Sequence, residues 1–146
     1  MKQEAWVLDG SAALAWVLPD ENSDTAEQFL SLIDNPYQVW VPALFWYEIA
    51  NALTMAERRR RISGAQKSRF HNLFLQLPLR TDAFIQGTAF LQYSASAVEH
   101  TLSAYDASYL ELACRRNLGL ISFDAKLREA ALSAGVLLWS RGQTES

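Results

Sequence analysis

Four acidic residues stand where apolar segments of this sequence end or turn. Asp9 follows the apolar run 5–8, Glu48 lies within the apolar stretch 44–53, Asp106 lies in the segment 104–108, and Asp124 follows the run 120–123. A carboxylate among apolar neighbours is costly to keep ionised unless it is paired, hydrogen-bonded or bound to a cation. Four such groups, with no Lys or Arg adjacent to any of them, repel one another when they are gathered. A hard divalent ion such as Mg²⁺ or Mn²⁺ removes this conflict, so the pattern predicts a metal site.

The elements that must position these acids follow from the hydrophobic pattern. Short apolar runs alternate with longer segments of helical period, which is typical of an α/β domain with a mostly parallel sheet. We predict strands over 5–8, 37–41, 77–79, 120–123 and 136–138. We predict helices over 11–18, 23–33, 43–60, 82–97, 105–117 and 125–133, and a further helix opened by the capping box that begins at Ser63. Gly119 is expected to end the helix 105–117.

The predicted elements place the acids where functional groups of such folds collect. In an open parallel sheet these groups lie at the carboxyl ends of the strands, and Asp9 and Asp124 directly follow predicted strands. Asp106 lies in the first turn of its helix, where the helix dipole favours negative charge. Glu48 lies inside a helix and shares a face with Asn51.

Each acid also has a purely structural interpretation. Asp9, Asp106 and Asp124 all suit the start of a helix, where acidic side chains are common for capping and dipole reasons. Glu48 is harder to explain in this way because its neighbours are apolar. The joint occurrence of the four acids therefore favours a functional site over four separate helix caps.

Length and composition limit the class of protein. The 146 residues fit a single domain, which we predict over residues 1–140, followed by a C-terminal tail at 141–146. The net charge of −3 gives no general attraction for nucleic acid, so any basic surface must be local. No apolar run approaches the roughly 20 residues of a membrane span, and the first residues make a poor signal peptide. Since the single Cys114 cannot form an internal disulfide, we expect a cytoplasmic protein.

Four segments resemble the PIN domain, specifically the VapC-type toxins of bacterial and archaeal toxin–antitoxin pairs. They are Val7–Leu14, Val41–Leu53, Leu102–Ala113 and Ile121–Leu127, and the likeness in order and spacing spans nearly the whole chain. The resemblance implies a PIN-like three-layer α/β/α domain. It also implies an endoribonuclease that depends on Mg²⁺ or Mn²⁺, is inhibited by a cognate antitoxin and is usually a homodimer.

Carried over by position, the resemblance assigns roles to seven residues of this chain. The family's four acidic positions fall on Asp9, Glu48, Asp106 and Asp124, and the polar positions beside them fall on Ser11, Asn51 and Ser122. The three aspartates are expected to be direct or water-mediated metal ligands, and Glu48 a ligand or a water-orienting base. The acids suit either one ion or two, and the polar residues are expected to fix the carboxylate rotamers. Gly10 stands where the family more usually has Ala or Thr.

Two other features have both functional and structural interpretations. The run Arg58–Arg61 suits contacts to RNA phosphates or to an acidic antitoxin segment, and it equally suits a solvated helix C-terminus. Trp16, Trp46 and Tyr47 suit an antitoxin groove or base stacking, and they equally suit the core.

Three other functions are alternatives to an endoribonuclease toxin. A phosphotransfer domain with Asp9 as nucleophile, as in haloacid-dehalogenase-like phosphatases, needs a second Asp where this chain has Ser11. A non-catalytic interaction module has no use for so costly a cluster of acids. A housekeeping RNA-processing nuclease is the close alternative, and the small size of the chain without an appended RNA-binding domain favours the toxin.

Overall fold

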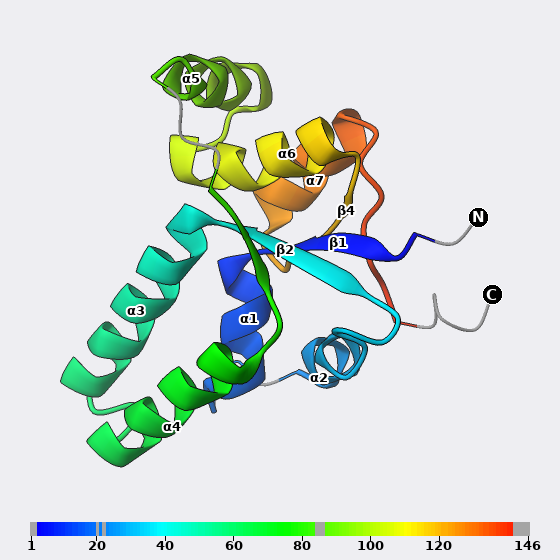
Figure 1. Cartoon of the computed structure of the whole chain (residues 1–146). Helices are drawn as coiled ribbons and strands as arrows, with labels where there is room; N and C mark the ends of the chain where they lie inside the picture. The colour runs from blue at the N-terminus through cyan, green and yellow to red at the C-terminus, as the bar shows by residue number, and fades with distance from the viewer. Residues whose placement is uncertain (1–2, 20, 22, 84–86, 142–146) are drawn as a thin grey trace.

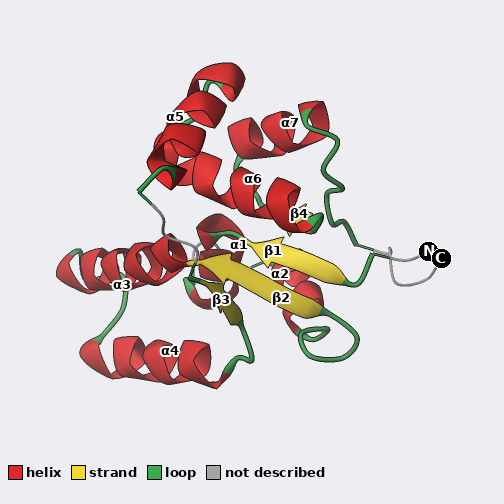
Figure 2. Cartoon of the chain, turned by 45° about the horizontal axis from the view of Figure 1, so that its top comes forward, coloured by secondary structure: helices red, strands yellow, loops and turns green. Residues whose placement is uncertain are grey.

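A computed structural model of the chain describes residues 3–19, 21, 23–83 and 87–141. Four strands form one sheet in the order β3–β2–β1–β4, and all three pairings are parallel (Figure 2). The strands are β1 (Ala5–Leu8), β2 (Gln38–Pro42), β3 (Arg80–Asp82) and β4 (Gly119–Ile121). In the register of the sheet, Trp6 lies opposite Val39 on one side and Gly119 on the other.

Helices cover both faces of the sheet. One side carries α1 (Gly10–Val17), α2 (Asp24–Leu30), α3 (Ala43–Arg58) and α4 (Gly64–Gln76). The other carries α5 (Ala89–His100), α6 (Ala104–Arg116) and α7 (Ala125–Ser133), with α6 packed on the strands and α5 against α6 (Figures 1 and 2). The predicted three-layer α/β/α fold is therefore confirmed. Within the described ranges, no helix combines the length and the apolar character needed to cross a membrane.

Local signals explain most of the element boundaries. The last three residues of β1 are fully buried, as expected of a central strand covered on both faces, and this is why its sequence is apolar without alternation. Ser63 caps α4, and the Gln66 side chain reaches back to the Ser63 N–H, which completes the predicted capping box. Asp124 caps α7, whose bounds match the prediction.

Tertiary contacts overturn the predictions around the edge strand. The strand lies at Arg80–Asp82 instead of 77–79, and the helix predicted from 82 begins at Ala89, with residues 84–86 outside the described part. Asp82 is buried in β3 because Arg115 and Arg116 bind its carboxylate, at 2.5 Å and 3.1 Å. The hydrophobic periodicity of the segment 77–97 cannot show that two distant arginines bind Asp82.

Three further expectations concern the C-terminal half. Gly119 does not end α6, because Asn117 adopts the left-handed conformation at that helix end and Gly119 lies within β4. The strand predicted over 136–138 is reduced to an isolated bridge between Leu120 and Leu138. The predicted tail at 141–146 falls outside the described residues beyond Arg141.

Candidate active site

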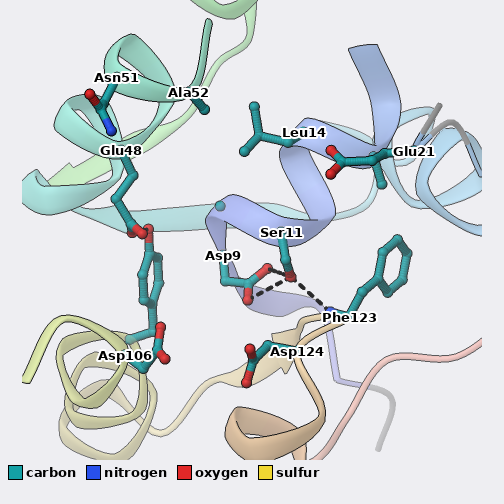
Figure 3. Close-up of a pocket in the computed structure, with 13 residues that line it drawn as sticks. Asp9, Ser11, Leu14, Glu21, Glu48, Asn51, Ala52, Asp106, Phe123 and Asp124 are labelled. Atoms are coloured by element: carbon teal, nitrogen blue, oxygen red, sulfur yellow. Dashed lines mark hydrogen bonds between the residues drawn. The ribbon is translucent and has the colours of Figure 1, made fainter. Parts of the chain in front are cut away.

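A pocket of about 640 Å³ lies where β1 and β4 end (Figure 3). The chain leaves β1 through α1 and α2 to build β2 on one side, and it later reaches β4 on the other side through α6. The boundary between β1 and β4 is therefore the topological switch point of the sheet, where ligand sites of such folds form. All four predicted acids line this pocket, together with Ser11 and Asn51.

Asp9 is the most buried of the acids, with 3% of its surface exposed. It caps α1 by accepting a hydrogen bond from the Ala12 N–H at 2.9 Å. The Ser11 hydroxyl lies 2.8 and 2.9 Å from its two oxygens, and the Ser122 hydroxyl donates to Oδ2 at 2.5 Å. Burial outweighs these hydrogen bonds and, with the nearby charge of Glu48, raises the pKa of Asp9 to about 6.

The same two serines tie the end of β4 to the end of β1. The Asp124 N–H donates to Ser122 Oγ at 3.0 Å, and the Phe123 N–H donates to Ser11 Oγ at 2.9 Å. Asp124 in turn accepts the Leu127 N–H at 2.8 Å as the cap of α7. The structure thus places both serines beside Asp9, where they hold its carboxylate in one orientation.

Asp106 enters the pocket from the first turn of α6 (Figure 3). Its N–H is capped by the Ser103 hydroxyl at 3.0 Å. Burial and the negative charge of Asp124 raise the pKa of this carboxyl above its ordinary value. Since Asp9, Asp106 and Asp124 all lie at helix starts, the positive ends of α1, α6 and α7 partly offset the gathered negative charge.

Glu48 reaches the pocket from α3 and accepts a hydrogen bond from the Tyr109 hydroxyl. Burial, with the charge of Asp106, raises the pKa of Glu48, and the bond from Tyr109 partly opposes this rise. The sequence prediction missed Tyr109, although its position three residues after Asp106 on the same helix face was a usable signal. Asn51 lines the pocket with an exposed side chain, and its role in holding a carboxylate stays a prediction.

The donor chemistry of the pocket fits a hard cation. Asp9, Glu48, Asp106 and Asp124 supply carboxylate oxygens, Glu21 adds a further acid, and no Lys or Arg is among the described residues that line the pocket. As placed, no three His, Cys, Asp or Glu side chains of the described chain gather closely enough to hold an ion. Three of the four carboxylates are held by separate partners, since Asp9 is bonded to Ser122, Glu48 to Tyr109 and Asp124 to the Leu127 N–H. Oxygen donors of this kind suit Mg²⁺ or Mn²⁺, whose retained waters bridge to more distant carboxylates.

The arginine run and the aromatic residues lie outside this cluster of acids. Arg58 ends α3 ten residues beyond Glu48, which is about 15 Å along a helix. Trp16 packs edge-on against Phe74 with ring centroids 5.8 Å apart. Trp46 donates its indole N–H to Thr81 at 2.9 Å, and Tyr47 is 74% exposed. Both tryptophans are thus engaged within the domain, and only the Tyr47 ring of these three is largely open to solvent.

The chain is similar to known proteins over most of its length. The family model described as PIN domain matches residues 6–132. The protein named Ribonuclease VapC3 from Pyrobaculum aerophilum is 30% identical over 127 residues, which cover 84% of this chain and 92% of that protein.

Solved structures show the same fold at lower identity. A crystal structure of a Pyrobaculum aerophilum protein has a TM-score of 0.68 at 24% identity, covering 92% of this chain and 88% of the other. A chain of VapBC2 from Rickettsia felis, crystallised with a DNA fragment from its promoter, has a TM-score of 0.67 at 13% identity. That match covers 92% of this chain and 97% of the other, so the similarity extends through the whole domain.

Proposed function

We propose that this chain, which belongs to the PIN domain family, is a metal-dependent endoribonuclease and the toxin of a toxin–antitoxin pair. The observation that carries the proposal is the pocket at the switch point of the sheet, lined by Asp9, Glu48, Asp106 and Asp124. The similarity of the chain to a protein named Ribonuclease VapC3 supports RNA as the substrate. The likeness to a structure named VapBC2 supports an antitoxin as the partner.

The four carboxylates would hold Mg²⁺ or Mn²⁺, as one ion or two. Bound there, the ion supplies an activated water and relieves the charge that builds on the phosphoryl oxygens during hydrolysis. The acids alone repel a phosphodiester, so this negative pocket suits RNA only in the presence of cations. The negative charge of the pocket therefore supports the proposed metal dependence.

Hydrogen bonds and helix starts within the chain fix the orientation of the proposed catalytic carboxylates. Ser11 and Ser122 hold both oxygens of Asp9, so this carboxylate does not reorganise when charge develops beside it. Asp124 and Asp106 are held at the starts of their helices. Glu48, with a raised pKa, is suited to orient the attacking water and accept its proton.

Cleavage of RNA by the purified chain tests the nuclease proposal. We expect activity with Mg²⁺ or Mn²⁺, loss of activity in EDTA, and a fall by orders of magnitude in Asp9→Asn and Asp106→Asn. The matched control is Asp24→Asn, which makes the same chemical change at an exposed acid in the first turn of α2. Full cleavage in EDTA, or full cleavage by folded Asp9→Asn, would contradict the proposed mechanism.

Growth measurements test the toxin proposal separately. Expression of the wild-type chain should arrest growth, Asp9→Asn should not, and co-expression of the cognate antitoxin should restore growth. Purified chain that cleaves RNA but leaves growth unaffected on expression would instead favour a housekeeping nuclease. Light scattering with and without the antitoxin tests the expected homodimer and its larger assembly.

A further inference from the structure

Tyr109 and Glu48 form a hydrogen bond that joins the two helical layers across the end of the sheet. Tyr109 lies on α6 and is 1% exposed, whereas Glu48 lies on α3 with its side chain half-buried. The Tyr109 hydroxyl donates to Glu48 Oε1, although 61 positions separate the two residues. Both side chains line the pocket that contains the other acids.

The bond gives the Glu48 carboxylate a hydrogen-bond donor that its own helix cannot supply. Asp9 and Asp124 accept N–H groups left free at the starts of their helices, but Glu48 lies inside α3, where backbone N–H groups are already paired. Within the described part of the chain, no other group donates a hydrogen bond to its carboxylate. Without this bond the glutamate keeps its side-chain freedom, and repulsion from Asp106 favours rotamers that leave the pocket.

The surroundings of the bond place it beside Asp9. A Cβ built on Gly10 would lie 3.7 Å from Glu48 Oε1 and 3.7 Å from the Tyr109 hydroxyl oxygen. Gly10 is the first residue of α1 and directly follows Asp9. The hydrogen-bonded pair therefore lies against the start of α1, and it fixes Glu48 next to the most buried acid of the pocket.

We infer that Tyr109 is a positioning residue that holds Glu48 toward the metal-binding pocket, so that the glutamate is preorganised to bind the ion and orient water. This inference rests on the proposed function and adds a residue to it. Tyr109 does not contact the reacting atoms and acts only through Glu48. The serines do the same for Asp9, so each of the two acids has hydroxyl partners that are specific to it.

Tyr109→Phe tests this role because it removes the hydroxyl and keeps the buried ring. Mn²⁺ affinity is measured by calorimetry on the folded full chain, and kcat and KM are measured on an RNA substrate. We expect Mn²⁺ affinity, kcat or both to fall about 10- to 100-fold, as is typical for loss of a partner that orients a ligand, with KM for RNA unchanged. The matched control is Tyr105→Phe, which removes an exposed hydroxyl four positions earlier on α6 and should change neither value.

A double-mutant cycle separates positioning from general packing. In a Glu48→Ala background, which removes the acceptor of the bond, Tyr109→Phe should cause little further loss, because its effect passes through the glutamate. Equal losses in both backgrounds, or wild-type Mn²⁺ affinity and kcat in Tyr109→Phe, would overturn the role of Tyr109 and leave the proposed function intact. Absence of Mn²⁺ binding and of RNA cleavage in the wild-type chain would overturn both.

Discussion

Replacing Asp9 by Asn should stabilise the metal-free protein at neutral pH. Burial raises the pKa of Asp9 from its ordinary value of 3.8 to about 6. A tenfold change in proton affinity corresponds to about 1.4 kcal/mol, so the ionised carboxylate costs the folded state roughly 3 kcal/mol near pH 7.5. Asn carries no charge and retains one acceptor oxygen for the Ala12 N–H, but it fits the two serine donors less well. We therefore expect a net gain of about 1–2 kcal/mol in the free energy of unfolding.

The pH dependence of this gain has a definite sign. Between pH 3.8 and about 6, the folded chain keeps a proton on Asp9 that the unfolded chain loses, so the stability from this group falls as the pH rises. Below pH 3.8 Asp9 is protonated in both the folded and the unfolded chain, and above about pH 6 the folded state bears the full cost of the buried charge. Since Asn does not titrate, the advantage of the variant over the wild type should be smallest near about pH 4 and largest near about pH 7.5.

Urea unfolding in EDTA at these two pH values, followed by tryptophan fluorescence, measures the effect. Saturating Mg²⁺ should then stabilise the wild type, by about 2.7 kcal/mol at 100 times the Kd, and should stabilise the variant much less. If Asp9→Asn changes the free energy of unfolding equally at both pH values, the buried charge is not what limits stability. That result would refute the reasoning even if the variant lacked nuclease activity.

Three further substitutions test the framework that positions the site, each by urea unfolding. Asp82→Asn should lower the free energy of unfolding by about 2 kcal/mol near neutral pH, because two arginines lose a buried partner. Burial raises the pKa of Asp82, but the two arginines outweigh burial and bring the pKa below 3.8. The loss of stability caused by Asp82→Asn should therefore disappear as the pH falls through that lower pKa. A loss of stability that does not depend on pH would contradict the ion pairs. Gly119→Ala should lower the free energy of unfolding by about 1–3 kcal/mol, because the added Cβ would lie 2.5 Å from the buried Trp6 ring. Wild-type stability of this variant would show that the ring can shift to make room. Gly10→Ala should raise stability by about 0.5 kcal/mol, because its Cβ finds ordinary contact distances at a helix start, and a clear loss would contradict that geometry.

The sequence alone predicted the elements whose signals are local. The run 5–8 is apolar throughout because β1 is covered on both faces, and this marks it as a central parallel strand. Ser63 and Asp124 mark the starts of α4 and α7, since a cap acts on backbone N–H groups within one turn. The four acids were recognisable for a similar reason, because carboxylates next to apolar runs stand out by type and position.

The edge of the sheet and the inner arrangement of the pocket depended on tertiary structure. Asp82 was placed in a predicted helix, but arginines 33 and 34 positions away bind it in an edge strand. Two partners of the acids are also distant in sequence, with Ser122 bonded to Asp9 across 113 positions and Tyr109 to Glu48 across 61.

Hydrophobic periodicity and helix caps act over one or two turns, so they reveal which segments form strands and helices and which acids follow them. The order of strands in the sheet then decides which ends meet, and only the folded chain removes Asp9 from water and raises its pKa. The sequence therefore identified the four acids that line the pocket, whereas tertiary structure decided which distant groups hold Asp9 and Glu48. That outcome follows because hydrogen bonds and desolvation depend on neighbours in space, and the folded sheet brings those neighbours together from distant parts of the chain.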